Sequence, residues 1–125
     1  MVRTERAPAP IGPYSQAIEA GGVLFLAGQI GASPHDGELA GPTVAEQTRQ
    51  ALANLCAVLE AAGAAPRDVV QATVYLTDLA DFAAMNREFE QVLGEARPAR
   101  ATVGVAALPR GAKVEIALIA VRARE

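Results

Sequence analysis

The segment 113–121 constrains the fold more than any other part of this chain. It alternates like a strand, and both of its sides are apolar, with Val114, Ile116, Leu118 and Ala120 on one side and Ala117, Ile119 and Val121 on the other. A sheet whose second face met solvent would carry polar residues there. We therefore expect a homo-oligomer that buries this face between subunits. The alternative is a monomer whose long loops fold over the sheet.

The remaining segments predict an α+β domain in the order β-α-β-α-β-β, with two helices on one face of a single sheet. Alternating apolar runs indicate strands over residues 23–30, 69–77, 100–105 and 113–121. The first helix should begin with a capping box, in which the Thr43 hydroxyl and the Glu46 side chain satisfy free N–H groups, and end at Gly63.

The second helix is expected to begin at Asp81, which can cap it, and to end at Gly94. Its apolar stripe consists of Phe82, Met85, Phe89 and Val92. Further on, the turn at residues 108–111 is expected to reverse the chain, so that the last two strands become neighbours in the sheet.

Length and composition narrow the class of protein. The 125 residues fit one domain, residues 1–125. A net charge of −3 and only 4% aromatic residues leave no cationic cluster or stacking platform, so no nucleic-acid partner is expected. Residues 1–13 lack the apolar core of a signal peptide, and no apolar run reaches the roughly 20 residues that cross a bilayer. We expect a cytoplasmic protein with no membrane partner.

Nucleophiles and metal ligands are scarce. The chain has one histidine, His35, and one cysteine, Cys56, which are too few for a zinc site within one chain and allow no internal disulfide. Its only serines are Ser15 and Ser33. Chemistry here must rely on arginine, glutamate, tyrosine, asparagine, threonine and the backbone.

Two charged residues on the last two strands are candidates for that chemistry. Glu115 shares a strand face with apolar residues, where burial raises a carboxyl pKa and suits it to act as a general acid or base. Arg100 follows the rigid Pro98 turn and could hold a carboxylate. Each also has an ordinary interpretation, as a charged side chain at a strand end with its head in water. If the two strands are neighbours, the side chains could converge.

Three more positions are open between a functional and an ordinary role. Tyr14 lies in a stiff proline-rich turn and either lines a pocket or packs in the N-terminal arm. Asn86 lies beside the apolar stripe of the second helix, where a solvated role is the commoner one. Gly28 begins a Gly-Gln-Ile-Gly run that lacks the full spacing of a phosphate-binding loop.

Four motifs in a single order resemble the RidA (YjgF-type) family of reactive-intermediate imine deaminases. They are the segments 9–16 (Ala-Pro-Ile-Gly-Pro-Tyr-Ser-Gln), 26–30 (Leu-Ala-Gly-Gln-Ile), 98–100 (Pro-Ala-Arg), and 114–116 (Val-Glu-Ile) with 119–121 (Ile-Ala-Val). The resemblance extends from about Ala7 to Arg122. It implies a chorismate-mutase-like α+β subunit in a homotrimer, with sites in the clefts between subunits.

The resemblance also implies the reaction, which is hydrolysis of 2-imino acids or their enamine tautomers to 2-keto acids and ammonia, without a metal or cofactor. By position, Arg100 matches the arginine that binds the substrate carboxylate, and Glu115 the glutamate that positions the attacking water. Tyr14 matches an aromatic residue lining the cleft, Gly28 a backbone group beside the substrate, and Asn86 an asparagine near the site.

The chain departs from the family pattern at three positions. Ala27 and Ala101 stand where serines are common, and Thr102 stands where deaminase-type members usually carry a cysteine; its hydroxyl can still bond substrate. These departures reduce the number of polar side chains expected near the site, and they leave two alternative functions open. One is a non-catalytic trimer that binds small 2-keto acids or acts as a stress-linked chaperone, and the other, less favoured, is RNA cleavage.

Overall fold

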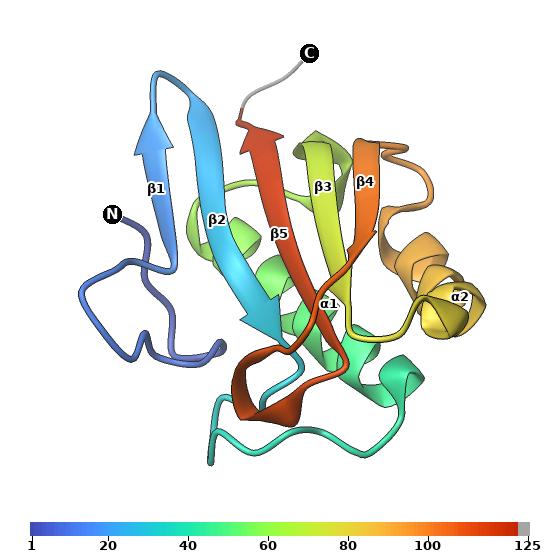
Figure 1. Cartoon of the computed structure of the whole chain (residues 1–125). Helices are drawn as coiled ribbons and strands as arrows, with labels where there is room; N and C mark the ends of the chain where they lie inside the picture. Colours follow the sequence, from blue (N-terminus) through green and yellow to red (C-terminus); the bar gives the residue numbers. More distant parts are fainter. Residues whose placement is uncertain (123–125) are drawn as a thin grey trace.

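Five strands form one mixed sheet in the computed structural model of this chain, which describes residues 1–122 (Figure 1). In chain order they are β1 (Ala17–Ala20), β2 (Val23–Ile30), β3 (Val69–Leu76), β4 (Ala99–Gly104) and β5 (Val114–Val121). Their order across the sheet is β1-β2-β5-β3-β4, and only β3 and β4 run parallel among these neighbours. The predicted α+β class is confirmed.

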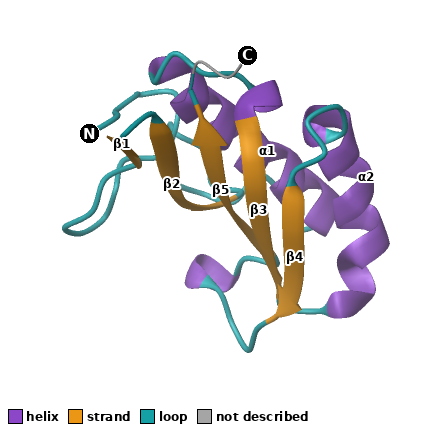
Figure 2. Ribbon diagram, turned by 90° about the horizontal axis from the view of Figure 1, so that it is seen from above, coloured by secondary structure: helices purple, strands orange, loops and turns teal. Residues whose placement is uncertain are grey.

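Both helices lie on the same face of the sheet, behind it in Figure 1 and to one side of it in Figure 2. They are α1 (Val44–Ala61) and α2 (Phe82–Leu93). The predicted capping box of α1 is present: Thr43 Oγ1 accepts from the Glu46 N–H at 3.2 Å, and Glu46 Oε1 accepts from the Thr43 N–H at 3.3 Å. No helix in the described part of the chain is long and apolar enough to span a bilayer.

The start of α2 agrees with the prediction in position, since Asp81 is its N-cap residue, but differs from it in the capping bond. Asp81 makes no capping bond with its side chain. Instead Asp78 accepts from the Ala80 N–H at 2.9 Å and caps a short 3-10 turn, η2 (Leu79–Asp81), that leads into α2. Met85 and Phe89 of the predicted stripe are buried, whereas Phe82, the first residue of α2, is 41% exposed.

The core lies between the helices and one face of the sheet. Alternate residues of β2, β3 and β5 are buried there against α1 and α2; the strands contribute Leu24, Leu26, Val69, Ala72, Val74, Leu76, Val114, Ile116, Leu118 and Ala120. The helices contribute Leu52, Leu55, Val58, Leu59, Met85, Phe89 and Leu93. Strand alternation thus places every second residue of the sheet on the opposite, uncovered face.

That uncovered face is apolar and exposed in the single chain. Phe25, Ile18 and Val103 are 48%, 44% and 41% exposed, and Ile119 is only half-buried. No loop among residues 1–122 covers these side chains. The second apolar side of β5 therefore has no cover within the described chain.

The predicted strand list and pairing need two corrections. The strand β1 was not predicted; it pairs with β2 through the Gly21-Gly22 turn, whose glycines have φ of 58° and 82°. The pairing of β4 with β5 was wrong, because β3 lies between them. The connection from Gly104 to Val114 contains its own 3-10 turn, η3 (Pro109–Gly111), and exceeds a hairpin loop of about two to five residues.

Candidate active site

A bulge in β2 brings Gly28 against Glu115. Leu26 pairs with Leu118 but Gln29 pairs with Ile116, so two residues of β2 oppose one of β5. A Cβ atom on Gly28 would lie 3.0 Å from the Glu115 carboxyl carbon and would collide with Oε2. The Glu115 side chain therefore lies across the bare backbone of Gly28, in space that any other residue would fill.

The chain just before β5, two residues before Glu115, is held by a buried glutamine. Gln47 of α1 is 2% exposed; its side chain accepts from the Lys113 N–H at 2.8 Å and donates to the Gly41 carbonyl at 2.9 Å. These bonds tie the start of β5 to α1 and to the loop before it. The strand end that carries Glu115 is thus held by a side chain that sequence patterning did not single out.

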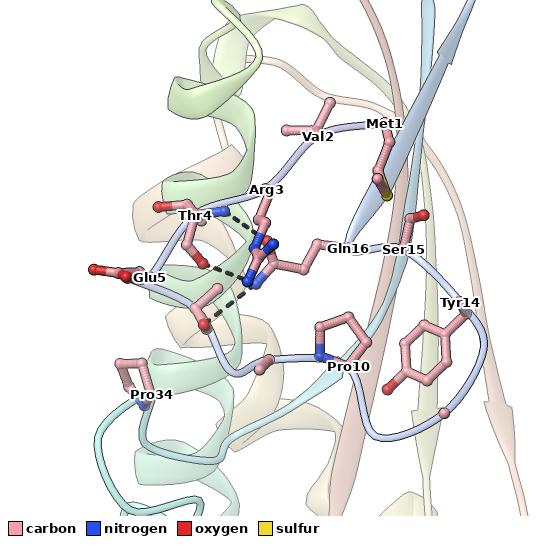
Figure 3. A pocket seen from close by; sticks show the side chains of 13 residues that line it. Met1, Val2, Arg3, Thr4, Glu5, Pro10, Tyr14, Ser15, Gln16 and Pro34 are labelled. Carbon is pink, nitrogen blue, oxygen red and sulfur yellow. Dashed lines mark hydrogen bonds between the residues drawn. The ribbon is translucent and has the colours of Figure 1, made fainter.

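Tyr14 is presented by an ordered N-terminal arm. Gln16, 3% exposed, accepts from the Thr4 N–H at 2.7 Å and donates to the carbonyls of Thr4 and Pro8 at 3.0 and 2.9 Å. Figure 3 shows Gln16 reaching back to the arm, with Tyr14 on the loop that follows Pro10. The Tyr14 side chain is 57% exposed and lines a cavity, so it is not packed within the arm.

Tyr14, Gly28 and Glu115 line one cavity of about 960 Å³, which opens at the end of the sheet where β2 stops and β5 begins. Ala27, at the position where serines are common in the family, lines it as well. Two polar residues that sequence reasoning missed, Gln29 and Arg110, share this cavity. Arg110 could have been suspected as a cation five residues before Glu115, but its turn had suggested only a chain reversal.

Burial gives the Glu115 carboxyl an altered acidity. Desolvation raises its pKa above the ordinary value for glutamate, as expected for a carboxyl on a largely apolar strand face. The raised pKa brings the group closer to neutral pH, where one side chain can accept a proton and return it. The candidate role of Glu115 as a general base thus has a physical basis in its surroundings.

Arg100, Asn86 and Thr102 lie elsewhere. The Arg100 Nη1 donates to Asn86 Oδ1 at 2.6 Å, and its guanidinium carbon lies 4.8 Å from the Phe89 ring centre and 5.4 Å from that of Phe82. Cation–π contact and the hydrogen bond to α2 fix the direction of the guanidinium while leaving its other donors free. Thr102 is two residues further along β4 and shares the same face.

Arg100 and Glu115 are separated by the sheet itself. Arg100 pairs with Ala72 of β3, whereas Glu115 pairs with Tyr75, three residues away and so on the other face. They are also about 10 Å apart along the strands and about 10 Å across them. The expectation that these side chains converge within one chain, as neighbours across a turn, was wrong, because β4 and β5 are not neighbours.

The other scarce residues stay outside this arrangement. His35 is exposed in the loop after β2, and Cys56 is half-buried in α1, where burial raises the pKa of its thiol. Among residues 1–122, no three histidine, cysteine, aspartate or glutamate side chains gather closely enough to hold a metal ion. The cavity therefore offers one carboxylate of raised pKa, an aromatic wall, free backbone and a guanidinium.

Comparison with known proteins places the chain in a family. The family model described as Endoribonuclease L-PSP matches residues 4–122. The chain is 51% identical over 120 residues to a RutC family protein of Pyrococcus horikoshii, with 96% of this chain and 95% of that protein covered. It is 45% identical over 122 residues to the 2-iminobutanoate/2-iminopropanoate deaminase of Capra hircus, with 98% and 89% covered.

The fold agrees as well as the sequence. The crystal structure of RidA from the Antarctic bacterium Psychrobacter sp. superposes with a TM-score of 0.92 at 45% identity, covering 96% of this chain and 97% of that one. These matches extend over almost all of residues 1–122 and include the segments that carry the motif resemblance. The chain accordingly belongs to the RidA (YjgF-type) family, whose family model bears the description Endoribonuclease L-PSP.

Proposed function

We propose that this chain hydrolyses 2-imino acids, or their enamine tautomers, to 2-keto acids and ammonia. The observation that carries the proposal is the Glu115 carboxyl, of raised pKa, lying over Gly28 in a cavity walled by Tyr14. Family membership supports it, as does the 45% identity to a relative named 2-iminobutanoate/2-iminopropanoate deaminase.

We further propose that the complete site forms between copies of the chain in a homotrimer. One copy would supply Glu115, Gly28 and Tyr14, and its neighbour would supply Arg100, Asn86 and Thr102. The location of Arg100 and Glu115 on opposite faces of the sheet supports this division, since a single chain cannot bring them together. The exposed apolar side chains of the uncovered face, among them Phe25, support association of copies.

The proposed chemistry needs only water. Arg100, already directed by Asn86, holds the substrate carboxylate with its free N–H donors. The Glu115 carboxylate takes a proton from a water molecule as the water oxygen bonds to the imine carbon. That proton passes to nitrogen and gives a carbinolamine. As the carbon–nitrogen bond then breaks, the hydroxyl proton also passes to nitrogen and the oxygen forms the ketone carbonyl, so one water is consumed and one ammonia released.

The test is a measurement of imine decay. 2-Iminobutanoate is generated enzymatically, and the rate of 2-ketobutyrate release is measured with and without the purified chain. The proposal requires acceleration over spontaneous hydrolysis that is lost in Glu115→Gln and in Arg100→Ala. Binding of 2-ketobutyrate by calorimetry, with no acceleration of release, would instead support the carboxylate-binding alternative.

RNA cleavage is a second candidate because the matching family model is described as an endoribonuclease. Phosphate binding draws on clustered lysine and arginine. Among the described residues that line the cavity with Glu115, Arg110 is the single cation. Incubating labelled RNA with the wild-type chain and with Glu115→Gln decides the matter: cleavage that this variant loses would overturn our preference for imine hydrolysis.

A further inference from the structure

Two polar residues in the Glu115 cavity have no part in the proposed hydrolysis. Gln29 and Arg110 both line it, together with Tyr14 and Gly28, and both come from the same copy of the chain as Glu115. An imino acid with a short alkyl side chain would use the carboxylate clamp, the water and the aromatic wall. It would leave the Arg110 guanidinium facing the remainder of the cavity.

Arg110 is held in an unusual backbone conformation. Its φ is 59°, a left-handed value that costs a non-glycine residue energy, within η3. Its guanidinium lies against the loop backbone at Gly37, with Nη2 3.6 Å from where a Cβ on that glycine would be. The guanidinium makes no ion pair with any acidic side chain of residues 1–122. Its charge is thus positioned in the cavity but not neutralised.

Gln29 is a buried polar side chain without a protein partner. It is 8% exposed, yet its amide makes no hydrogen bond within residues 1–122, and neither amide atom is sealed from solvent. Buried amides are normally paired, since an unpaired one costs free energy. The other buried glutamines, Gln16 and Gln47, follow that rule with several bonds each. Gln29 pairs with Ile116, whose side chain faces the helices, so the Gln29 side chain lies on the opposite face of the sheet from Glu115 and takes no part in the subsite proposed below.

The second acid in the cavity makes no ion pair with Arg110. Asp36 also lines it, but its Oδ1 accepts from the Glu38 N–H at 2.9 Å and thereby caps its own turn. Cavities of roughly 300–1,000 Å³ hold drug-sized ligands. At about 960 Å³, the volume leaves room beyond what a small monocarboxylate would fill.

We propose that Arg110 forms a subsite for a second carboxylate at the far end of the substrate, so that the chain accepts short dicarboxylic 2-imino acids such as the imines of aspartate and glutamate. A guanidinium can donate two parallel N–H bonds to the two oxygens of a carboxylate. This inference rests on the proposed function: Arg100 of the neighbouring copy holds the first carboxylate, Glu115 directs the water, and Arg110 selects the side chain.

The test compares two imines across matched variants. An amino-acid oxidase generates the imine of glutamate or 2-iminobutanoate in place, and kcat/KM is measured for both. Arg110→Gln removes the charge, Arg110→Lys keeps it, and both retain a side chain at the left-handed position. Arg67→Gln removes an equal charge from an exposed position outside the cavity.

We expect the ratio of kcat/KM for the dicarboxylic imine over 2-iminobutanoate to fall about 10- to 100-fold in Arg110→Gln, mainly through KM. Arg110→Lys should retain much of the ratio, and Arg67→Gln should leave it unchanged. The inference is overturned if the wild type hydrolyses 2-iminobutanoate but not the dicarboxylic imine. It is equally overturned if Arg110→Gln lowers both rates alike.

A different result would separate this inference from the proposed function. If the wild-type chain accelerates neither imine, imine hydrolysis fails, and the subsite is then judged by calorimetry with 2-ketoglutarate and 2-ketobutyrate. Tighter binding of 2-ketoglutarate that is lost in Arg110→Gln would support the subsite in a binding protein. Equal binding of the two acids, or no change in Arg110→Gln, would overturn it.

Discussion

The Arg100 guanidinium and the Glu115 carboxylate lie on opposite faces of one sheet, because Arg100 pairs with Ala72 and Glu115 with Tyr75 on an alternating strand. Arg100 is directed by α2, through its 2.6 Å bond to Asn86, and Glu115 lies across Gly28 on the uncovered face. Any reaction that uses both groups has to bring two chains together. The assembly and the chemistry are therefore expected to depend on each other.

Replacing Arg100 by alanine should lower kcat/KM for 2-iminobutanoate about 10- to 100-fold, since a charged hydrogen-bond partner of the carboxylate is lost. Asn86→Ala should have a smaller effect, because the cation–π contacts with Phe82 and Phe89 still orient the guanidinium. Arg87→Ala, an exposed arginine on the same helix, is the control. Equal losses in Arg87→Ala and Arg100→Ala would contradict a specific role for Arg100.

Replacing Glu115 by glutamine should lower kcat about 100-fold or more, in the range typical for loss of a general base. Wild-type kcat/KM should fall as the pH decreases through the raised pKa of Glu115, at a pH above the roughly 4.3 of an ordinary glutamate. The pH–rate profile from pH 4 to pH 8 measures this. An inflection at or below the ordinary value would argue against the raised pKa.

The same substitution should change stability in a pH-dependent way. A carboxyl whose pKa is raised by folding contributes stability that is fully present below its unfolded-state pKa and is lost as pH rises through its folded-state pKa. Glu115→Gln should therefore raise Tm over the wild type at pH 7, and the difference should shrink at pH 4. Calorimetric scans at the two pH values test this. A larger gain at pH 4 would reverse the assigned sign.

The architecture was more predictable than the pairing of its strands. The Thr43 capping box and the apolar stripe of α1 are local signals, and the structure bears them out. The neighbours of β4 are decided by where β3 enters the sheet, which turn residues do not encode. The length of the connection through η3, which exceeds a hairpin loop, was the signal that β4 and β5 are not paired. Strand β1 escaped notice because Ala17–Ala20 lacks a strong apolar alternation, although Gly21-Gly22 suits a two-residue hairpin.

The candidate site was predictable only in parts. Glu115 stood out as a carboxylate in an apolar strand, but Tyr14 and Asn86 were singled out through the family resemblance. Gln29 and Arg110 were missed, because their meaning depends on the β2 bulge and on the loop that approaches Gly37. Such contacts join segments far apart in the chain, and no spacing rule within one segment reveals them.

Replacing Gly28 by alanine should lower activity about 10- to 100-fold, because the new Cβ displaces the Glu115 carboxylate from its place. Gly104→Ala is the matched control, since its Cβ would meet Leu79 at 3.4 Å. In a Glu115→Ala background, Gly28→Ala should no longer reduce Tm. A double-mutant cycle on Tm measures this coupling, and additive losses in Tm would contradict the contact.

Replacing Phe25 by glutamate should convert the assembled protein to smaller species and abolish activity, although Phe25 lies outside the cavity. The charge would be buried on the apolar face if copies still associated, which is costly. Sedimentation at several concentrations measures the change. Leu79→Glu alters another exposed apolar residue, in the η2 turn before α2, and should leave the mass unchanged. An unaltered mass for Phe25→Glu would argue against association through this face.

Mixing two variants of strongly reduced activity tests most directly whether Arg100 and Glu115 act from different chains. Arg100→Ala and Glu115→Gln subunits are unfolded together in equal amounts and refolded, so that copies combine at random. A site between two copies, here called a seam, is intact when its Arg100 comes from a Glu115→Gln copy and its Glu115 from an Arg100→Ala copy. Random pairing makes about one quarter of the seams intact, so about a quarter of wild-type activity should return. If both groups acted within one chain, the mixture would keep the low activity of its parents.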